Sequence, residues 1–396
     1  MGEERITVRE YAEQRDWGAV EELEKRCQVG PSGKVSLYTD CMGDPLSRVR
    51  HSPAFLMLVA EYGEGREIVG VIRGSIRTVT TGRKQPNTDS PLFTKVAYIL
   101  GLRVSPLHRR LGIATKLVQK LEAWCKQQQG VEYAYMATDC SNEASINLFT
   151  LNCAYLKFRT PAILVHPVHV HRVPVDPDVA VVPLAPSLAD SIYRRAFSTS
   201  EFFPKDIDAV LSSKLTLGTF LALPKSWIPV WDPLKGVLPP SLAILSVWNT
   251  KEVYKLQVKG ASTLTKSWCA WSRVLDTCMP CMRIPSVPDF FRPFGVYLMY
   301  GLHMEGKAGA GLMRALCAFV HNMARADPDC GAVVTEVGML DPVREAVPHW
   351  KRFSWEEDIW CMKRLVGQED VDVGGHSDWP RSRPSSSVLF VDPRDF

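Results

Sequence analysis

Hydrophobic and polar positions in the first 160 residues follow two periods, one typical of strands and one typical of helices. Apolar runs and alternating stretches predict strands over 6–11, 55–60, 68–72, 96–104 and 131–138, with a last strand near 155–158. Apolar residues three and four positions apart predict a helix over about 112–128, and a further helix is expected from Ser141 onward. The predicted order is therefore β-α-β-β-β-α-β-α, with an amphipathic helix directly after the first strand.

The second half of the chain repeats this order of elements. Strands are expected over 179–184, 219–223, 242–248, 253–258, 294–303, 331–337 and 359–365, and helices over 189–197, 205–215, 312–324 and 341–350. A Gly-rich loop over 306–311 opens one helix as residues 109–114 open the helix of the first half, and Asp341 stands where Asn142 would. We therefore predict a second, diverged copy of the first half.

These patterns predict an α/β (α+β) protein with a mixed central sheet flanked by helices. A length of 396 residues favours two domains, because a single hydrophobic core usually stops growing below that size. The predicted divisions are a first domain over 1–160, a Pro-rich linker over 161–178, a second domain over 179–366 and a largely disordered tail over 367–396. The apolar run at 388–391 is a candidate for docking back as a strand.

Composition narrows the function classes. Hydrophobic residues make up 46% and charged residues 23% of the chain, as is ordinary for a globular protein. The net charge of +4 is spread thinly, so direct nucleic-acid binding is not expected, and no apolar run has the ~20 residues of a membrane helix. The 11 irregularly spaced cysteines are typical of free thiols, which predicts a cytoplasmic or nuclear location.

The segment from Val104 to Thr115 carries the clearest chemistry. A strand enters a turn with Gly112 and Ala114, and a helix then begins. The first turn of a helix presents unpaired N–H groups and partial positive charge, so this turn is competent to bind a pyrophosphate. The alternative is a plain strand-to-helix turn in which glycine serves only packing.

Two segments resemble the signatures of the GNAT superfamily of N-acetyltransferases. Arg109-x-x-Gly112-x-Ala114 resembles its Arg/Gln-x-x-Gly-x-Gly/Ala motif, and the stretch from Asn142 to Phe149 resembles its Asn-x-x-Ala/Ser-x-x-Leu-Tyr motif. The resemblance implies a GNAT fold for residues 1–160 and a second, degenerate GNAT-like domain over 179–366. It also implies acetyl-CoA as co-substrate, an amine of a protein or small molecule as acceptor, direct attack on the thioester, and no metal.

The resemblance assigns the binding residues one by one. Backbone amides would hold the pyrophosphate at Arg109, Arg110, Gly112, Ile113, Ala114 and Thr115. The strand carrying Leu102 and Val104 would pair with the pantetheine arm, and an amide near Leu102 would polarise the thioester carbonyl. Asn142 would contact the pantetheine.

The sequence departs from the family pattern at the catalytic groups. The tyrosine that protonates the departing thiolate in many relatives is Phe149 here, and Tyr155 is a weak substitute. The strand 97–104 lacks the glutamate often used as base. Glu61, Asp139 and His108 remain as candidates for it, each with a solvated or structural role as the alternative. A non-catalytic, acyl-CoA-binding regulatory protein therefore stays open as a second function.

The order of the predicted elements, the length of the chain and several short stretches of sequence extend the resemblance to most of the chain. Leu156–Pro161 and Val391–Arg394 look like the plant Hookless-type probable N-acetyltransferases. This implies a role in ethylene- and auxin-linked differential growth.

The remaining candidate sites favour structural roles. Cys278 and Cys281 have zinc-like spacing, but no second close pair follows them. The histidines at 166, 169 and 171 are expected in a solvated, Pro-rich loop. The tryptophans at 227, 231, 248, 268 and 271 are expected as core and loop aromatics.

Overall fold

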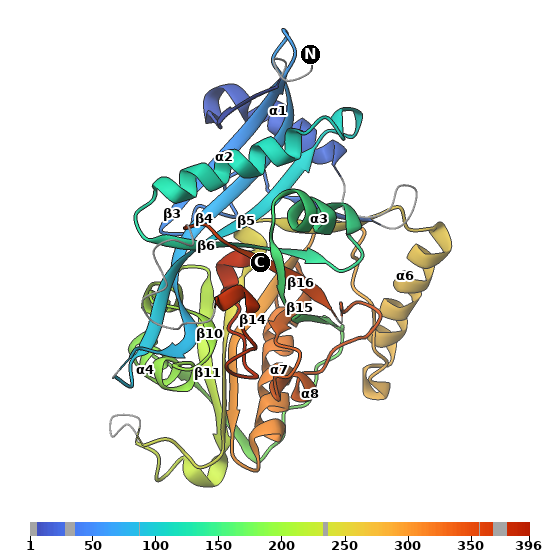
Figure 1. The fold of residues 1–396 in the computed structure, drawn as a ribbon. Helices are drawn as coiled ribbons and strands as arrows, with labels where there is room; N and C mark the ends of the chain where they lie inside the picture. Colours follow the sequence, from blue (N-terminus) through green and yellow to red (C-terminus); the bar gives the residue numbers. More distant parts are fainter. Residues whose placement is uncertain (1–5, 28–35, 87, 233–236, 356, 367–377) are drawn as a thin grey trace.

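The computed structural model describes residues 6–27, 36–86, 88–232, 237–355, 357–366 and 378–396, and it contains two packed β-sheet bodies (Figure 1). Each body has a long helix, α2 (Ile113–Gln127) or α7 (Gly309–Arg325), packed on its sheet. A two-stranded ribbon of β2 (Ser36–Asp40) and β13 (Lys255–Lys259) also joins the two halves of the chain.

The first sheet has eight strands. Seven run in the order β1–β3–β4–β5–β6–β16–β7, and β10 pairs with β4. Their bounds are β1 (Ile6–Glu10), β3 (Ala54–Tyr62), β4 (Glu67–Lys84), β5 (Pro91–Val104), β6 (Val131–Asp139), β7 (Leu156–Arg159), β10 (Glu201–Pro204) and β16 (Asp358–Arg364). All of these pairings are antiparallel except that of β5 with β6.

Alternation along the strands decides which helix covers which face. Leu58 and Ala60 of β3 belong to the core beneath α2, whereas Met57 and Val59 belong to the core beneath α1 (Glu13–Arg26). The close approach of α2 needs a glycine on β4, because a Cβ at Gly74 would lie 2.9 Å from a methyl carbon of Leu121. The two faces of the first sheet are therefore the α1 face and the α2 face.

The second sheet has six strands in the order β8–β15–β14–β12–β11–β9. These are β8 (Ala162–Pro167), β9 (Val179–Leu184), β11 (Thr216–Pro224), β12 (Leu242–Asn249), β14 (Gly295–Glu305) and β15 (Cys330–Val337). The shorter helices of the chain are α3 (Glu143–Asn147), α4 (Pro186–Ala196), α5 (Ile207–Leu211) and α8 (Val343–Ala346), and the longer α6 (Thr263–Cys278) lies at one side of the molecule (Figure 1). As in the first body, the pairing next to the long helix, β14 with β15, is parallel.

The two bodies exchange strands, which corrects the predicted divisions. Strand β8 lies in the predicted linker 161–178 and pairs with β15, whereas β16, from the predicted second domain, lies between β6 and β7 in the first sheet. Strand β10 also crosses from the second half to pair with β4. The linker prediction was wrong because apolar residues of β8 such as Leu164 are buried in the second body.

The C-terminal segment is ordered, which corrects the prediction of a largely disordered tail for the part from 378 to 396. Trp379 is buried, and the N–H of Phe390 donates to the carbonyl of Glu201 at 3.0 Å. The side chains of Arg394 and Asp395 are buried and paired with Asp206, Arg77 and Tyr135. Residues 367–377 lie outside the described residues.

Candidate active site

An opening between β5 and β6 marks the centre of the first body. The parallel pairing of these strands runs from Lys95 and Val131 to Ile99 and Met136 and then ends. Strand β5 continues to Val104 and β6 to Asp139, so the two strands diverge over their last residues. The backbone of 100–104 therefore presents an edge on this side without a strand partner in the described sheet, which an extended ligand can use.

A bulge on β5 fixes the point of divergence. Gly101 has a φ of +62°, and the register between β4 and β5 shifts between the pairs Val71–Arg103 and Arg73–Leu100. A Cβ at Gly101 would lie 2.7 Å from Nη1 of Arg73, so glycine is required for both conformation and space. The guanidinium of Arg73 is held by Glu24 at 2.5 Å and by the carbonyl of Pro45. Leu102 follows the bulge directly, at the position that the sequence assigned to carbonyl polarisation.

The start of α2 forms an open cradle beside the end of β5. Arg109, Arg110 and Gly112 are exposed, and both Arg110 and Gly112 have positive φ. Gly112 is the N-cap of α2 and provides no side chain, so the amides of the first turn lack a side-chain cap. No atom lies within 4 Å of the place where a Cβ of Gly112 would stand. Uncapped amides at a helix start, with open space beside Gly112, fit a pyrophosphate.

Asn142 caps helix α3 at the end of β6. Its side-chain oxygen accepts from the N–H of Ser145 at 3.3 Å, and its Nδ2 donates to Oγ1 of Thr138 at 3.0 Å. The residue is exposed, so a ligand in the opening can reach it. Thus the structure brings the cradle residues, Leu102, Val104 and Asn142 to the ends of β5, α2 and β6, around one opening.

Phe149, which stands where many relatives have the proton-donating tyrosine, and Tyr155, its candidate substitute, both lie in the core. Phe149 is 1% exposed and Tyr155 is 2% exposed, and their rings pack edge to face with centroids 5.1 Å apart. Burial, together with the nearby charge of Glu122, raises the pKa of Tyr155 well above its usual value. Tyr155 is a core aromatic in this structure.

Two of the base candidates have other partners. Glu61 is buried on β3 and forms an ion pair with Arg9 at 2.5 Å, and β4 separates it from β5. His108 follows the end of β5, where its Nδ1 lies 3.3 Å from Oγ of Ser105 and its ring packs on Tyr62. The structure does not bring either residue together with Asp139.

Asp139 belongs to a cluster of three carboxylates, which we call the acidic cluster: Asp139, Glu336 and Asp358. Asp358 of β16 lies opposite Asp139 of β6 in the antiparallel ladder. Glu336 of β15 accepts a hydrogen bond from Nε1 of Trp360 at 2.9 Å. The members come from both bodies and meet at the end of β6, where β5 diverges.

Burial sets the protonation of this cluster. Desolvation, followed by repulsion from Asp358, raises the pKa of Glu336 to about 8, and desolvation followed by repulsion from Asp139 raises the pKa of Asp358 to about 7. Burial raises the pKa of Tyr98 on β5 well above its usual value, against a smaller lowering by the charge of Arg48. Carboxylates with pKa values near neutrality are suited to exchange protons at physiological pH.

The acidic cluster shares the α1 face with a small polar pocket at the bulge. The pocket has a volume of about 30 Å³ and is lined by Gly101 and by side chains that include Glu24, Tyr38, Arg73 and Arg103. Because the cradle at the start of α2 belongs to the other face, the two faces of the opening carry different chemistry. One face fits an anion, and the other presents acids and polar groups.

Sequence reasoning missed Glu336 and Asp358. Both come from the second half, and no motif links them to the first. The usable signal was the presence of an acid in otherwise apolar strand patterns, since a charged residue at a buried position needs a partner or a function. Only the order of the strands in space shows that these acids stand beside Asp139.

The second body repeats the layout of the first. Gly301 of β14 has a φ of +61°, and the parallel pairing of β14 with β15 ends at Leu298 and Val334. Asp341, just before α8, accepts a hydrogen bond from the N–H of Val343. The loop before α7 is closed, however, because a Cβ at Gly306 would lie 2.1 Å from the carbonyl oxygen of Pro240. The second body therefore has the GNAT-like arrangement of strands, but the loop before α7 leaves less space for a ligand than the start of α2 does.

Two other predictions, for the histidines and for the tryptophans, are corrected by the structure. The histidines at 169 and 171 are 5% and 8% exposed, so the expected solvated loop was wrong. Trp268 and Trp271 lie on α6 with 74% and 64% of their surface exposed, and are not core or loop residues. Cys278 and Cys281 are exposed free thiols. No helix among the described residues is long and apolar enough to cross a membrane.

The divergent parallel strands, the bulge and the uncapped helix start define a GNAT-type acetyltransferase fold. The Acetyltransferase (GNAT) family model matches residues 17–155. Probable N-acetyltransferase HLS1 of Arabidopsis thaliana is 50% identical over 98% of this chain and 99% of its own length. Acetyl transferase GW6a of Oryza sativa subsp. japonica is 43% identical over 99% of this chain and 97% of its own. The chain belongs to this Hookless-type family of probable N-acetyltransferases.

Both sheet bodies take part in the likeness to a solved acyltransferase. The structure of Saccharomyces cerevisiae N-myristoyltransferase with bound myristoyl-CoA superposes with a TM-score of 0.55 at 8% identity, covering 98% of this chain and 85% of that one. At this identity the likeness concerns the fold alone.

Proposed function

We propose that this protein transfers an acetyl group from acetyl-CoA to an amine of a protein or small molecule. Family membership supports acetyl transfer, and the geometry at the ends of β5 and β6 supports the cofactor and its placement. The observation that carries the proposal is the divergence of β5 from β6 next to the uncapped start of α2. Acetyl-CoA would supply the acetyl group as a thioester, and the amine would form the new C–N bond as the C–S bond breaks.

Residues on the α2 face bind and orient the donor in this proposal. Amides from Arg109 to Thr115 hold the pyrophosphate, because helix-start N–H groups complement a dianion without requiring a charged side chain. The free edge of β5 around Leu102 and Val104 pairs with the pantetheine arm, and the exposed Asn142 contacts it from β6. An amide near Leu102, positioned by the bulge at Gly101, faces the thioester carbonyl.

The acidic cluster accepts the proton of the attacking amine in this proposal. An amine with a pKa of ~10.4 is mostly protonated at neutral pH and must lose a proton before attack. A carboxylate of raised pKa is a better base for this purpose than an ordinary one. Asp139 is the member predicted from the sequence, and Glu336 and Asp358 are added from the structure.

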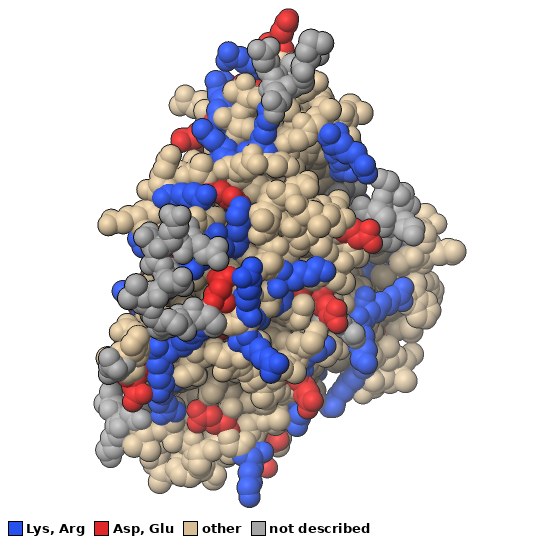
Figure 2. All heavy atoms as spheres, in the orientation of Figure 1, with Lys and Arg blue, Asp and Glu red and all other residues tan. Residues whose placement is uncertain are grey.

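The mixture of acidic and basic side chains on the surface supports an acceptor other than a polyanion such as a nucleic acid. Figure 2 shows Lys and Arg interspersed with Asp and Glu on the viewed face, without the basic concentration that phosphate backbones require. The 11 free cysteines support a cytoplasmic or nuclear location. A role in ethylene- and auxin-linked differential growth is inferred from the family resemblance.

The experiment is a calorimetric titration of the full chain with acetyl-CoA, followed by thiol release across a panel of amines. Mass spectrometry then identifies acetylated products. We expect saturable binding with one site per chain and acetyl transfer to at least one amine class. Lack of acetyl-CoA binding by the folded protein contradicts the proposal.

The alternative function is that of a regulatory protein that binds acyl-CoA without turnover. Phe149 favours it, because the ring stands where many relatives have the proton-donating tyrosine, and so does the absence of an acid on β5 between 97 and 104. Binding of acetyl-CoA without any acetylated product across protein, peptide and small-amine panels would select this alternative.

A further inference from the structure

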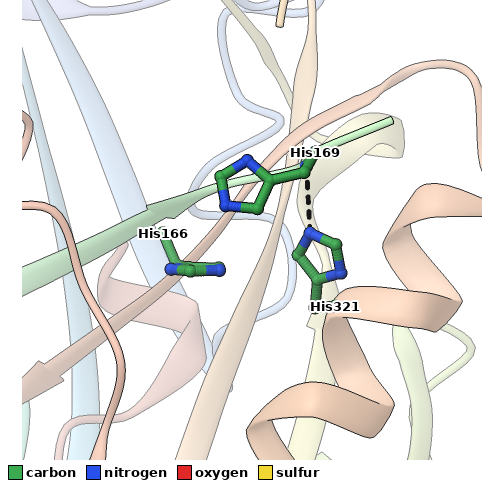
Figure 3. Close-up of side chains that lie close together, drawn as sticks. All are labelled: His166, His169 and His321. Carbon is green, nitrogen blue, oxygen red and sulfur yellow. Dashed lines mark hydrogen bonds between the residues drawn. The ribbon is translucent and has the colours of Figure 1, made fainter. Parts of the chain in front are cut away.

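We propose that the histidines at 166, 169 and 321, which we call the histidine triad, bind a divalent transition metal such as Zn²⁺ in the second body. One ring nitrogen from each residue lies within 4.8 Å of those of the other two. His166 comes from β8, His169 from the segment after it, and His321 from α7, and Figure 3 shows the three rings converging. The tight transition-metal sites of proteins commonly use imidazole nitrogens in such groups.

Hydrogen bonds around the triad favour the tautomers that a metal needs. His169 donates from Nδ1 to the carbonyl of Ser286 at 2.9 Å, which leaves a lone pair on Nε2. His321 carries a lone pair on Nε2, since that atom accepts from the backbone N–H of His169 at 2.9 Å. A metal at the centre would replace this second hydrogen bond. Among the described residues, Nδ1 of His166 and Nδ1 of His321 have no hydrogen-bond partner.

Two members of the triad are buried, and the third, His166, is partly exposed. His321 is 1% exposed and His169 is 5% exposed.

A second layer of contacts holds His169 in place. His171 stacks on His169 with ring centroids 5.2 Å apart, and its Nδ1 lies 2.8 Å from Oδ1 of Asp276. Asp276 in turn accepts from the hydroxyl of Ser286 at 2.5 Å, next to the carbonyl that receives Nδ1 of His169. Such outer contacts are typical of metal-binding histidines, because they fix the ring and its tautomer.

A cavity of about 490 Å³ adjoins the triad and leaves room for a fourth ligand. It is lined by all three histidines and also by Arg314, Cys317 and Met299. Three protein ligands with an open position facing a cavity are the arrangement of zinc sites that keep a water or an exchangeable ligand. The inference is independent of the acetyl-CoA site, which lies in the first body.

The alternative is a polar packing cluster that never holds a metal, and titration of tag-free, metal-stripped protein with Co²⁺ separates the two. Co²⁺ replaces Zn²⁺ and reports its ligand geometry through visible absorption. We expect one Co²⁺ per chain, absorption bands typical of four-coordinate nitrogen and oxygen ligands, and displacement of Co²⁺ by Zn²⁺. Absence of saturable binding by the folded wild-type chain overturns the proposal.

His166→Gln is the central variant, because His166 is partly exposed and its Nδ1 makes no hydrogen bond to be lost. We expect metal affinity to fall by more than the roughly 10–100-fold that outer contacts contribute. His303→Gln is the matched control, since His303 pairs with Glu305 away from the triad, and its metal affinity should equal that of the wild type. If both variants lose the same metal affinity, or if neither loses any, the assignment is contradicted.

A thermal measurement covers the case in which a variant folds poorly. Excess Zn²⁺ should raise the Tm of the wild-type chain and of His303→Gln but not that of His166→Gln, because a metal that binds only the folded state stabilises it. The same Tm shift in all three proteins would place the binding elsewhere and overturn the proposal.

Discussion

Asp358 stands directly opposite Asp139 in the ladder between β16 and β6, although the two acids are far apart in the sequence. This register exists only because β16 returns from the second half of the chain into the first sheet. The candidate active site therefore needs both halves of the chain, because the second half contributes two acids to it, Glu336 from β15 and Asp358 from β16.

We expect acetyl transfer to depend on pH through the acidic cluster. The raised pKa values mean that Glu336 and Asp358 carry protons below neutrality and cannot then accept one from the amine. The kcat/KM should rise with pH through about 7 to 8. Glu336→Gln should lower kcat, by up to the ~10²–10⁴ that acid–base catalysis contributes, and shift the rising limb.

Glu345→Gln is the control for that experiment, because Glu345 is an exposed acid on α8. It should keep the wild-type pH profile. Acetyl-CoA affinity should be unchanged in both variants, since the cluster is assigned to the acceptor side. A Glu336→Gln enzyme with the wild-type rate and profile would remove the cluster from the reaction.

Gly112 offers a test of the pyrophosphate cradle with two nearly isosteric side chains. Asn and Asp both tolerate positive φ better than most residues, and no atom lies within 4 Å of the new Cβ. Gly112→Asp should weaken CoA binding by about 10-fold or more relative to Gly112→Asn, because only the former places a negative charge beside the phosphates. Titration calorimetry at low and high salt measures the difference, and equal affinities would mean that the phosphates bind elsewhere.

Phe149→Tyr should destabilise the fold without raising turnover. The ring is 1% exposed and packs edge to face on Tyr155, so a new hydroxyl would be placed in an apolar core. A buried hydroxyl without a hydrogen bond costs about 1–3 kcal/mol. Urea unfolding measures the loss of stability, and thiol release from acetyl-CoA measures turnover. Faster turnover at unchanged stability would show that the ring edge reaches the departing sulfur.

Periodicity predicted the individual elements of the first body well, because each buries a face that the sequence records locally. The strand around 96–104, the helix beginning near Ile113 and the strand over 131–138 all match β5, α2 and β6. The exchange of β8 and β16 between the two bodies could not be predicted from the hydrophobic pattern of the sequence. An apolar strand shows that it will be buried, but its pattern does not say against which sheet.

In the C-terminal segment, too, the sequence does not show which distant residues are the partners, here for charged side chains. The sequence places Asp392, Arg394 and Asp395 in a segment predicted to be a disordered tail, but all three are buried in the structure. Charges are buried when they neutralise one another, and their partners Arg77 and Asp206 are distant in sequence. The acidic cluster was hidden for the same reason.

Arg394→Met tests how strongly the C-terminal segment is docked. Although burial alone would lower the pKa of Arg394, the charge of Asp392 and the bond to Asp206 raise it. In the same way, burial alone would raise the pKa of Asp392, but the charges of Arg394 and Arg77 lower it well below its usual range. Removing Arg394 leaves a buried carboxylate short of its partner, which should cost about 3–5 kcal/mol in the free energy of unfolding.

The pH dependence of this loss has a definite sign. A carboxyl whose pKa is lowered by folding contributes stability that is present above its unfolded value of ~3.9 and is lost as pH falls through the folded value. The difference in the free energy of unfolding between the wild type and Arg394→Met should therefore be largest at pH 7 and should decrease in acid. Arg381→Met, at an exposed residue of the same segment, is the control and should change stability by less than ~0.5 kcal/mol. Urea unfolding at pH 7 and at about pH 3, below the unfolded pKa of ~3.9, measures both variants. A loss at pH 7 in Arg394→Met no larger than in the control would show that the segment adds nothing to the stability of the fold.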